Sequence, residues 1–194
     1  IADGLPQIQI TYLYCDSKGF IWVGTKFGVA RWDGKQFKVF TPKEGAAGRQ
    51  VVMITELTDG SIAVAWQGSA LNIIKGDVIE MVELPKHWNA VSVSGIYKHT
   101  IDKIFVYVYA FSDDKTYKKS VVSVYNIRTK KFEKEIWLRQ WCVVDVKEDG
   151  SIITANLSET GRGADEFYLY KYNWFVSSLR FPFQFNGLNH SRYP

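Results

Sequence analysis

Glycines that end tight turns recur in this sequence at a nearly constant interval, and this repeat limits the folds that the chain can adopt. Gly19 follows a turn and precedes an apolar segment, and Gly60 does the same 41 residues later. Gly34 lies in a second turn, and Gly76 is its counterpart 42 residues later. Two landmarks with nearly the same spacing indicate a structural repeat in which each unit buries its apolar faces against its neighbours.

The first repeat contains four short apolar segments that are separated by turn residues. The segments cover residues 8–14, 20–25, 29–32 and 37–40. Asp16 to Gly19, Gly28 and Asp33-Gly34 lie between them. This pattern is typical of a four-stranded antiparallel meander, which is too small to be stable alone.

The same pattern continues less regularly through the rest of the chain. We expect units at about 7–40, 49–82, 91–136 and 139–180, and we expect residues 185–194 to begin a further repeat because Gly187-Leu188 matches Gly4-Leu5. Aromatic residues make up 15% of the sequence, which favours strands over helices. We therefore predict an all-β fold, a single module over residues 1–194 made of β-propeller blades that belong to a larger propeller. Trp22, Phe105 and Ile153 should fill the gaps between blades.

The first repeat resembles the two-component regulator propeller repeat of bacterial hybrid sensor kinases. The resemblance rests on Gly4-Leu5-Pro6, Asp16, Gly19, Trp22-Val23-Gly24-Thr25, Gly28, Arg31 and Phe37. It implies that Asp16, Gly19, Trp22, Gly24, Thr25 and Gly28 form the structural motif of the repeat. It also implies a periplasmic sensor region of a Bacteroides-type hybrid two-component system. In such a system an oligosaccharide is sensed and the signal passes to a histidine kinase, a module that these residues do not contain.

Other classes of protein lack support in the sequence. The net charge is +4 with scattered basic residues, so we expect no nucleic-acid partner. No segment approaches the length of a membrane span, and we expect no membrane insertion of this part. Cys15 and Cys142 are too few for a disulfide framework, and the three histidines have no metal-ligand spacing. We expect no catalytic residue, metal or cofactor.

Ligand-binding residues are expected on one face of the propeller. There the innermost strands begin and the loops between second and third strands surround the channel mouth. Aromatic rings, amides and guanidinium groups in such loops suit a sugar. The predicted ligand-binding residues are Arg49, Gln50, Trp66, His87, Trp88, Asn89, Arg139 and Trp141. The competing interpretation is packing between blades for the tryptophans and simple exposure for Arg49, Arg139 and His87.

Two other functions stay open at this point. The propeller could be a structural module that spaces or dimerises its neighbours, further blades and kinase modules of the parent protein included. A carbohydrate-active enzyme would instead need two facing carboxylates, for which the predicted loops offer Glu159 and Asp165. Asp113 and Asp114 are adjacent in a polar insertion and are interpreted as a solvated loop.

Overall fold

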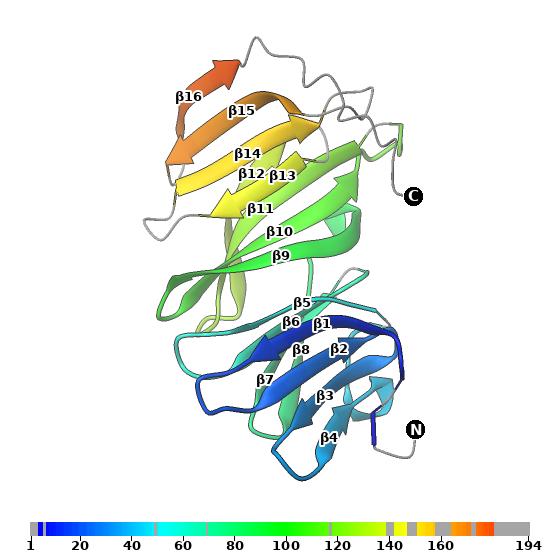
Figure 1. Cartoon of the computed structure of the whole chain (residues 1–194). Helices are drawn as coiled ribbons and strands as arrows, with labels where there is room; N and C mark the ends of the chain where they lie inside the picture. Colours follow the sequence, from blue (N-terminus) through cyan, green and yellow to red (C-terminus); the bar gives the residue numbers. More distant parts are fainter. Residues whose placement is uncertain are drawn as a thin grey trace, which may run out of the picture.

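The protein is built almost entirely from β-strands. The computed structural model describes residues 4–5, 7–48, 50–68, 70–116, 118–138, 142–146, 151–157, 164–171 and 174–180, with side chains described up to residue 138 and in 151–154. Within these ranges, strands form four four-stranded antiparallel sheets, accompanied by the short 3₁₀ helices η1 (Pro42–Glu44) and η2 (Lys86–Trp88) (Figure 1). The predicted all-β class is confirmed.

Each sheet contains four strands that are consecutive in the sequence and lie side by side in chain order. Blade 1 contains β1 (Ile10–Cys15), β2 (Ile21–Thr25), β3 (Gly28–Trp32) and β4 (Phe37–Phe40). Blade 2 contains β5 (Val51–Glu56), β6 (Ile62–Trp66), β7 (Ala70–Lys75) and β8 (Val78–Glu83). Blade 3 contains β9 (Ala90–Thr100), β10 (Lys103–Phe111), β11 (Lys118–Asn126) and β12 (Lys131–Leu138). Blade 4 contains β13 (Cys142–Val146), β14 (Ser151–Leu157), β15 (Ala164–Lys171) and β16 (Trp174–Arg180).

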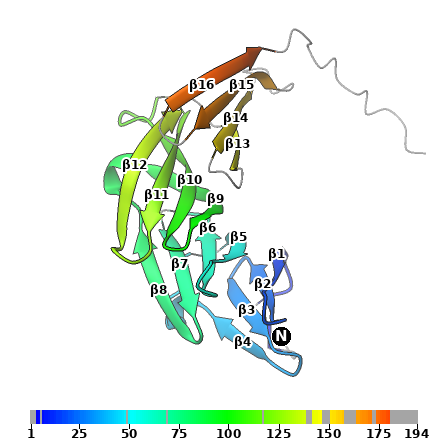
Figure 2. The same ribbon diagram turned by 90° about the vertical axis from the view of Figure 1, so that its left-hand side faces the viewer.

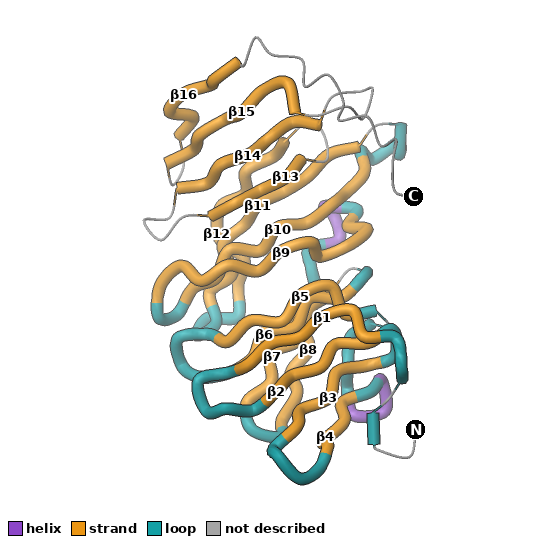
Figure 3. Tube along the Cα trace, viewed as in Figure 1, coloured by secondary structure: helices purple, strands orange, loops and turns teal. Residues whose placement is uncertain are grey.

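The four blades fan around a common axis and form an open arc (Figure 2). Their first strands, β1, β5, β9 and β13, lie on the inner side of the arc, and the fourth strands lie on the outer side. As the repeat predicts, β1 lies beside β5, and β5 lies beside β9. Turns gather at the two ends of the strands, where they form two loop-bearing faces (Figure 3). This arrangement is that of consecutive blades in a partial β-propeller.

Apolar side chains fill the spaces between adjacent blades. Trp22, Val29 and Phe40 of blade 1 pack against Ile54 and Trp66 of blade 2. The next interface joins blades 2 and 3, and its buried residues include Leu57, Ala65, Leu71, Ile73, Trp88, Val93, Ile96, Ile104 and Val106. The interface of blades 3 and 4 contains Phe105, Tyr107, Val122, Val124, Leu138 and Ile152. Stability therefore depends on contacts between units, as in other repeat proteins.

Two of the three residues that were expected between blades are buried there. Trp22 and Phe105 are 2% and 1% exposed. Ile153 is half-buried, and its neighbour Ile152 occupies the core instead. The difference follows from strand alternation, because Ile152 points back at blade 3 whereas Ile153 lies on the opposite side of the sheet, where this chain provides no further described blade.

Hydrogen bonds from turns also link blade 1 to blade 2 and blade 2 to blade 3. Ser17, in the turn after β1, donates from its N–H (3.0 Å) and its hydroxyl (2.6 Å) to the carboxylate of Glu56 in blade 2. Thr58, in the corresponding turn of blade 2, donates its hydroxyl to the carbonyl of Ile101 in blade 3 at 2.7 Å. Glu56 is 7% exposed, so its carboxylate depends on the donors of the preceding blade.

The repeat motif of blade 1 orders its turn and its inter-blade surface. The Asp16 carboxylate accepts hydrogen bonds from the backbone N–H groups of Lys18 (3.0 Å) and Phe20 (2.9 Å) and from the Trp22 indole N–H (2.8 Å). This set fixes the Trp22 ring, which stacks on Phe40 with centroids 5.9 Å apart. The network thus connects the conformation of a surface turn to the packing of a core residue.

Arg31 extends this motif across to blade 2. Its guanidinium lies 4.9 Å from the centroid of the Phe20 ring and 5.7 Å from that of Trp22. It donates to the Gly76 carbonyl and to the Asp77 carboxylate, both at 2.9 Å. One side chain therefore bridges two blades through aromatic and polar contacts together.

Thr25 and Gly28 close the hairpin between β2 and β3. The Thr25 hydroxyl donates to the Gly28 carbonyl at 2.9 Å and accepts from the Phe27 N–H at 3.1 Å. Gly28 has a φ of +143°, and a Cβ there would lie 2.8 Å from the Phe40 carbonyl oxygen. No other residue type fits this position without moving the backbone.

The unit boundaries expected from the sequence remain a proposal, and residues 185–194 lie outside the described residues. Among the residues that the structure describes, no helix is long and apolar enough to cross a bilayer.

Candidate functional site

The strand register places several predicted binding residues on one face of the propeller. Ile10 at the start of β1 pairs with Thr25 at the end of β2, and Ala90 at the start of β9 pairs with Ala110 of β10. The starts of the innermost strands and the loops between second and third strands therefore lie at the same end of each blade. We call this end, which carries η1 and η2 (Figure 3), the loop face.

Several of the predicted ligand-binding residues are buried or lie away from the others. Trp66 is 0% exposed in the core between blades 1 and 2, and a Cβ at Gly48 would lie 2.7 Å from its Cβ. Gln50 is half-buried, and its carbonyl accepts from the Gln67 N–H at 2.9 Å. Arg49, Arg139 and Trp141 lie outside the described residues. The structure does not bring Gln50 and Trp66 together with the residues near η2.

The connector from blade 2 to blade 3 brings His87, Trp88 and Asn89 together. It forms one turn of 3₁₀ helix, closed by hydrogen bonds from Trp88 N–H to the Pro85 carbonyl and from Asn89 N–H to the Lys86 carbonyl. Asn89 ends the turn in the left-handed conformation with a φ of +50°, a conformation that Asn tolerates better than most residues. Trp88 is fully buried, with its ring 4.9 Å from that of Phe132 on β12.

A single carboxylate, that of Glu135 on β12, receives donors from this connector. The Trp88 indole N–H donates to its Oε1 at 2.8 Å, and His87 Nε2 lies 3.0 Å from the same oxygen. The Trp137 indole N–H donates to Oε2 at 3.2 Å. Glu135 therefore joins the connector to the outermost strand of blade 3.

A second set of polar contacts borders the first. The Asn89 amide donates to the Asp113 carboxylate at 2.9 Å, and Lys119 Nζ lies 3.7 Å from the same carboxylate. Lys119 Nζ also lies 4.3 Å from the centroid of the Trp137 ring, which is a cation–π contact. We call the whole group the Glu135 cluster, which comprises His87, Trp88, Asn89, Asp113, Lys119, Glu135 and Trp137.

The chemistry of the Glu135 cluster suits recognition better than reaction. Both Glu135 oxygens already accept N–H donors, so this carboxylate is held rather than free to exchange a proton with a substrate. The groups that face solvent are the His87 imidazole, the Asp113 carboxylate and the Trp137 indole, which is 41% exposed. An aromatic surface beside donors and acceptors can contact a polyhydroxylated ligand.

The position of the cluster differs from the sequence expectation. The predicted site surrounds the mouth of the central channel, whereas Glu135 and Trp137 lie on β12, the outermost strand of blade 3. The connector starts at the outer strand β8 and packs on β12 before the chain turns inward to β9. Glu135, Trp137 and Lys119 were missed because their relation to His87 depends on this packing and has no local sequence signal.

The turn that carries Asp113 is held by its neighbour Asp114. The Asp114 carboxylate accepts from the Ser112 hydroxyl (2.6 Å) and from the N–H (3.0 Å) and hydroxyl (2.8 Å) of Thr116, and these bonds lower its pKa to about 2. Asp113 and Asp114 thus form an ordered turn at the edge of the cluster. Both residues are exposed, as the interpretation of this segment as a solvated loop predicts.

We expect the Asp114 carboxyl to titrate at about pH 2, well below its ordinary value of 3.8. Because the folded pKa is lowered, the stabilisation of this turn is complete above the unfolded value and is lost as the pH falls toward 2. Carbon-13 NMR titration of the aspartate carboxyls, with Asp114→Asn to assign the resonance, measures the midpoint. A midpoint near 3.8 would contradict the hydrogen-bonded turn.

No metal site is found in the described part of the chain, where no group of three His, Cys, Asp or Glu side chains could hold an ion. The two carboxylates considered for an enzyme are Glu159, which lies outside the described residues, and Asp165, whose backbone alone is described.

Comparison with known proteins supports both the repeat and the fold. Residues 4–27 match the model of the family Two component regulator propeller, which confirms the resemblance seen in the first repeat. No curated protein matches the sequence.

Solved structures match over most of the chain. The extracellular domain of the putative one component system BT4673 from B. thetaiotaomicron has a TM-score of 0.66 at 12% identity, covering 90% of this chain and 22% of that one. The Dos1 propeller has a TM-score of 0.65 at 12% identity, covering 90% of this chain and 48% of that one. The WD40 propeller of Doa1 has a TM-score of 0.57 at 10% identity, with coverage of 86% and 52%.

Two conclusions follow from these matches. At such low identity the likeness establishes the fold alone, which is that of β-propeller blades. The chain spans about a fifth of the BT4673 extracellular domain that it matches.

Proposed function

We propose that this chain is part of an extracytoplasmic, periplasmic sensory propeller of a hybrid two-component sensor. The observation that carries the proposal is the match of residues 4–27 to the regulator-propeller family, on a fold also found in the extracellular domain of BT4673. The kinase that would receive the signal lies outside these 194 residues.

The ligand that we propose is an oligosaccharide, bound at the loop face by the Glu135 cluster. The exposed part of Trp137 offers an apolar surface to the C–H groups of a sugar ring. His87, Asn89 and Asp113 lie beside it and offer donors and acceptors to hydroxyl groups. This combination of one aromatic surface with a few placed polar groups is typical of small-molecule sites.

The position of the cluster suggests how binding could be transmitted. Its members come from the connector that leaves blade 2, from the turn after β10, from the start of β11 and from β12 of blade 3. A ligand that contacts both the connector and β12 can bind differently to two relative positions of these blades. Such a differential affinity is what shifts a conformational equilibrium.

Isothermal titration calorimetry of the full-length gene product, with a panel of oligosaccharides of defined composition, tests this proposal. We expect binding of at least one glycan and, because the aromatic contact contributes ~1.5 kcal/mol, an affinity about tenfold lower for Trp137→Ala. His87→Ala should weaken binding as well. Phe27→Ala is the matched control, since Phe27 is an exposed aromatic residue of blade 1, outside the cluster. Unchanged affinity in Trp137→Ala and His87→Ala would exclude the cluster as the site.

A second function, that of a structural or dimer-forming propeller without a ligand, is favoured by one observation. Trp66 and Trp88, both predicted to bind ligand, are fully buried in the cores between blades. If this function is correct, no glycan produces heat, and self-association measured by sedimentation is the same for Trp137→Ala as for the unaltered protein.

A further inference from the structure

The Glu135 carboxylate uses the donors of the connector and leaves an acceptor of His87 open. The indole N–H groups of Trp88 and Trp137 donate to this carboxylate, and His87 Nε2 lies 3.0 Å and 3.2 Å from its two oxygens. A ring nitrogen that faces two carboxylate oxygens carries the hydrogen. In the neutral imidazole Nδ1 is therefore an acceptor, and it has no partner among the described residues.

Asn89 and Asp113 leave further acceptors open toward solvent. Asn89 Nδ2 donates to Asp113 Oδ1 at 2.9 Å, so that the amide oxygen of Asn89 and Oδ2 of Asp113 have no partner in the described part of the chain. The Asp113 side chain is 90% exposed. One hydrogen of the Asn89 amide also stays available, but three open acceptors outnumber it. The cluster is thus best matched by a ligand that supplies donors.

The Glu135 cluster also carries a local negative charge in a chain whose net charge is +4. With a neutral imidazole, Asp113 and Glu135 contribute −2 and Lys119 contributes +1, which leaves −1. The Lys119 side chain is only 16% exposed, so the charge that faces solvent is chiefly that of Asp113. Lys86 and Lys115 lie on the same segments and are exposed, and within the described residues neither forms an ion pair with these carboxylates.

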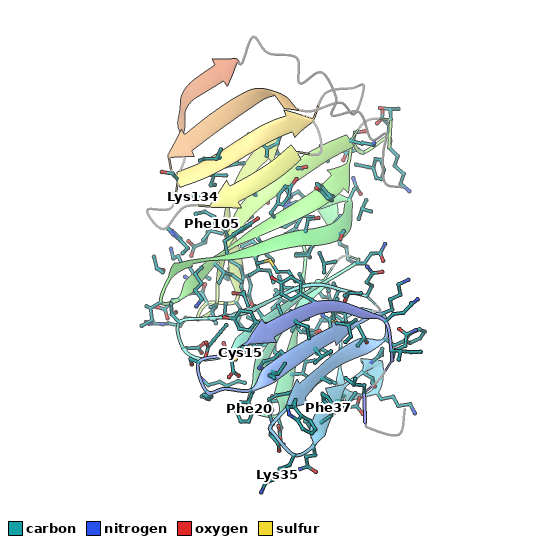
Figure 4. All side chains as sticks on the ribbon, viewed as in Figure 1. Cys15, Phe20, Lys35, Phe37, Phe105 and Lys134 are labelled. Carbon is teal, nitrogen blue, oxygen red and sulfur yellow. The ribbon has the colours of Figure 1, made fainter. Side chains whose placement is uncertain are left out.

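The lysine that precedes Glu135 acts on a different carboxylate. Lys134, labelled in Figure 4, is the extra residue of a β-bulge in β12 and has a φ of +50°. A bulge changes the direction of its strand. Hydrogen bonds, chiefly the one from Lys103, and the positive charges of Lys103 and Lys134 lower the pKa of Glu133. The charge of Lys134 therefore stabilises Glu133, and the Glu135 cluster keeps its negative charge.

We propose that the glycan bound by the Glu135 cluster carries a free amino group. An ammonium group supplies both N–H donors for the open acceptors and a positive charge for Asp113, whereas a hydroxyl group supplies no charge and a carboxylate supplies neither. Lys119 shows within the chain that an ammonium group fits these surroundings, since its Nζ lies 3.7 Å from the Asp113 carboxylate and 4.3 Å from the centroid of the Trp137 ring. The inference rests on the proposed function and specifies the class of sugar for that site.

Paired glycans in the calorimetric titration of the full-length gene product test this inference. Oligomers of glucosamine and of galactosamine are each compared with the N-acetylated oligomer of the same length, and an oligogalacturonate supplies the anionic case. We expect the free amine to bind about three- to tenfold more tightly than its acetylated counterpart, as an exposed charge-assisted contact contributes. The oligogalacturonate should bind most weakly, because its carboxylates repel Asp113.

Salt and pH show whether the preference is electrostatic. Raising the salt concentration from about 50 mM to about 500 mM should reduce the preference, since salt screens exposed charges. Raising the pH from about 7 to about 9 should abolish it, because an amine of the α-amino type then loses its proton while Asp113 stays a carboxylate.

The variant Asp113→Asn separates charge from shape. The new side chain can still accept the hydrogen bond from Asn89 but carries no charge, and we expect the affinity ratio of amino to acetylated glycan to fall to about one. Asp77→Asn is the matched control, since Asp77 is an exposed aspartate of blade 2 that pairs with Arg31 at 2.9 Å, outside the cluster. It should leave the ratio unchanged.

The outcomes separate this inference from the proposed function. Equal or weaker binding of the amino glycans, in a protein whose glycan affinity falls in Trp137→Ala, would overturn the inference and leave the site in place. A preference for amines that survives Asp113→Asn would also overturn it. If no glycan of the panel binds, the proposed function fails and the inference fails with it.

Discussion

Replacing Trp22 with alanine should lower the free energy of unfolding by about 3–5 kcal/mol, as is typical of fully buried aromatic residues. Trp22 is 2% exposed, stacks on Phe40 and donates its indole N–H to Asp16 at 2.8 Å. The substitution leaves a cavity between blades 1 and 2 and removes a donor from the Asp16 carboxylate. Urea denaturation followed by far-ultraviolet circular dichroism measures the change.

Two variants separate the contributions to this effect. Trp22→Phe keeps most of the ring volume but removes the hydrogen bond to Asp16, and it should cost about 1–3 kcal/mol. Trp32→Ala alters a half-buried tryptophan of the same blade on the side of the sheet opposite Trp22, away from blade 2. An equal loss of stability in Trp22→Ala and Trp32→Ala would mean that the interface of blades 1 and 2 does not hold this chain together.

Gly24→Ala should destabilise the protein by about 1–3 kcal/mol through overpacking between blades. A Cβ at Gly24 would lie 2.6 Å from Cγ1 and 2.8 Å from Cβ of Val51, at the start of blade 2. Because the contact involves a Cβ atom, rotation of the valine side chain cannot relieve it. The backbones of β2 and β5 must separate, and the melting temperature should fall.

A compensating substitution tests this explanation directly. Val51→Ala alone should also destabilise the protein, since Val51 is 1% exposed in the same core. In the double variant, the contact of the new methyl group with Val51 Cγ1 at 2.6 Å is removed, whereas the Cβ of residue 51 remains, so the relief is partial. The double-mutant cycle should therefore give a favourable coupling energy of about 1 kcal/mol, and strict additivity would contradict the contact.

The fold could be predicted from this sequence because the turn residues recur at a nearly regular spacing. Gly19 and Gly60 mark equivalent turns in which the N–H of Asp16 or Leu57 bonds to the carbonyl of Phe20 or Ser61. The spacing of such turns fixes where each meander ends, whatever the side chains between them are. The loss of a clear motif in blades 3 and 4 therefore did not obscure the number of units.

The roles of individual acidic residues were harder to predict. Asp16 and Asp59 both precede a turn glycine, yet the hydrogen bonds align Asp16 with Leu57 instead. Asp59 serves its own turn by accepting from the Ser61 N–H at 3.0 Å, whereas Asp16 also fixes the Trp22 ring. Residue type alone could not distinguish a local turn from a link to the core.

The candidate site depends on contacts between distant segments, which the sequence does not encode locally. His87 and Trp88 were recognised because aromatic and polar residues in a connector between blades suit a sugar. Glu135 was not recognised, because in the sequence a glutamate on a strand cannot be distinguished from any other solvent-facing residue. Its role depends on how the connector crosses the outer edge of blade 3.

Every described sheet in this protein is completed by its own four consecutive strands, and no strand is exchanged between sheets. A gene segment encoding one such unit can therefore be duplicated or deleted without breaking any ladder of backbone hydrogen bonds. Only the side chains at the new junction have to adapt. This modularity offers a simple evolutionary route by which propellers of this kind change in circumference while the loops of the remaining units keep their positions.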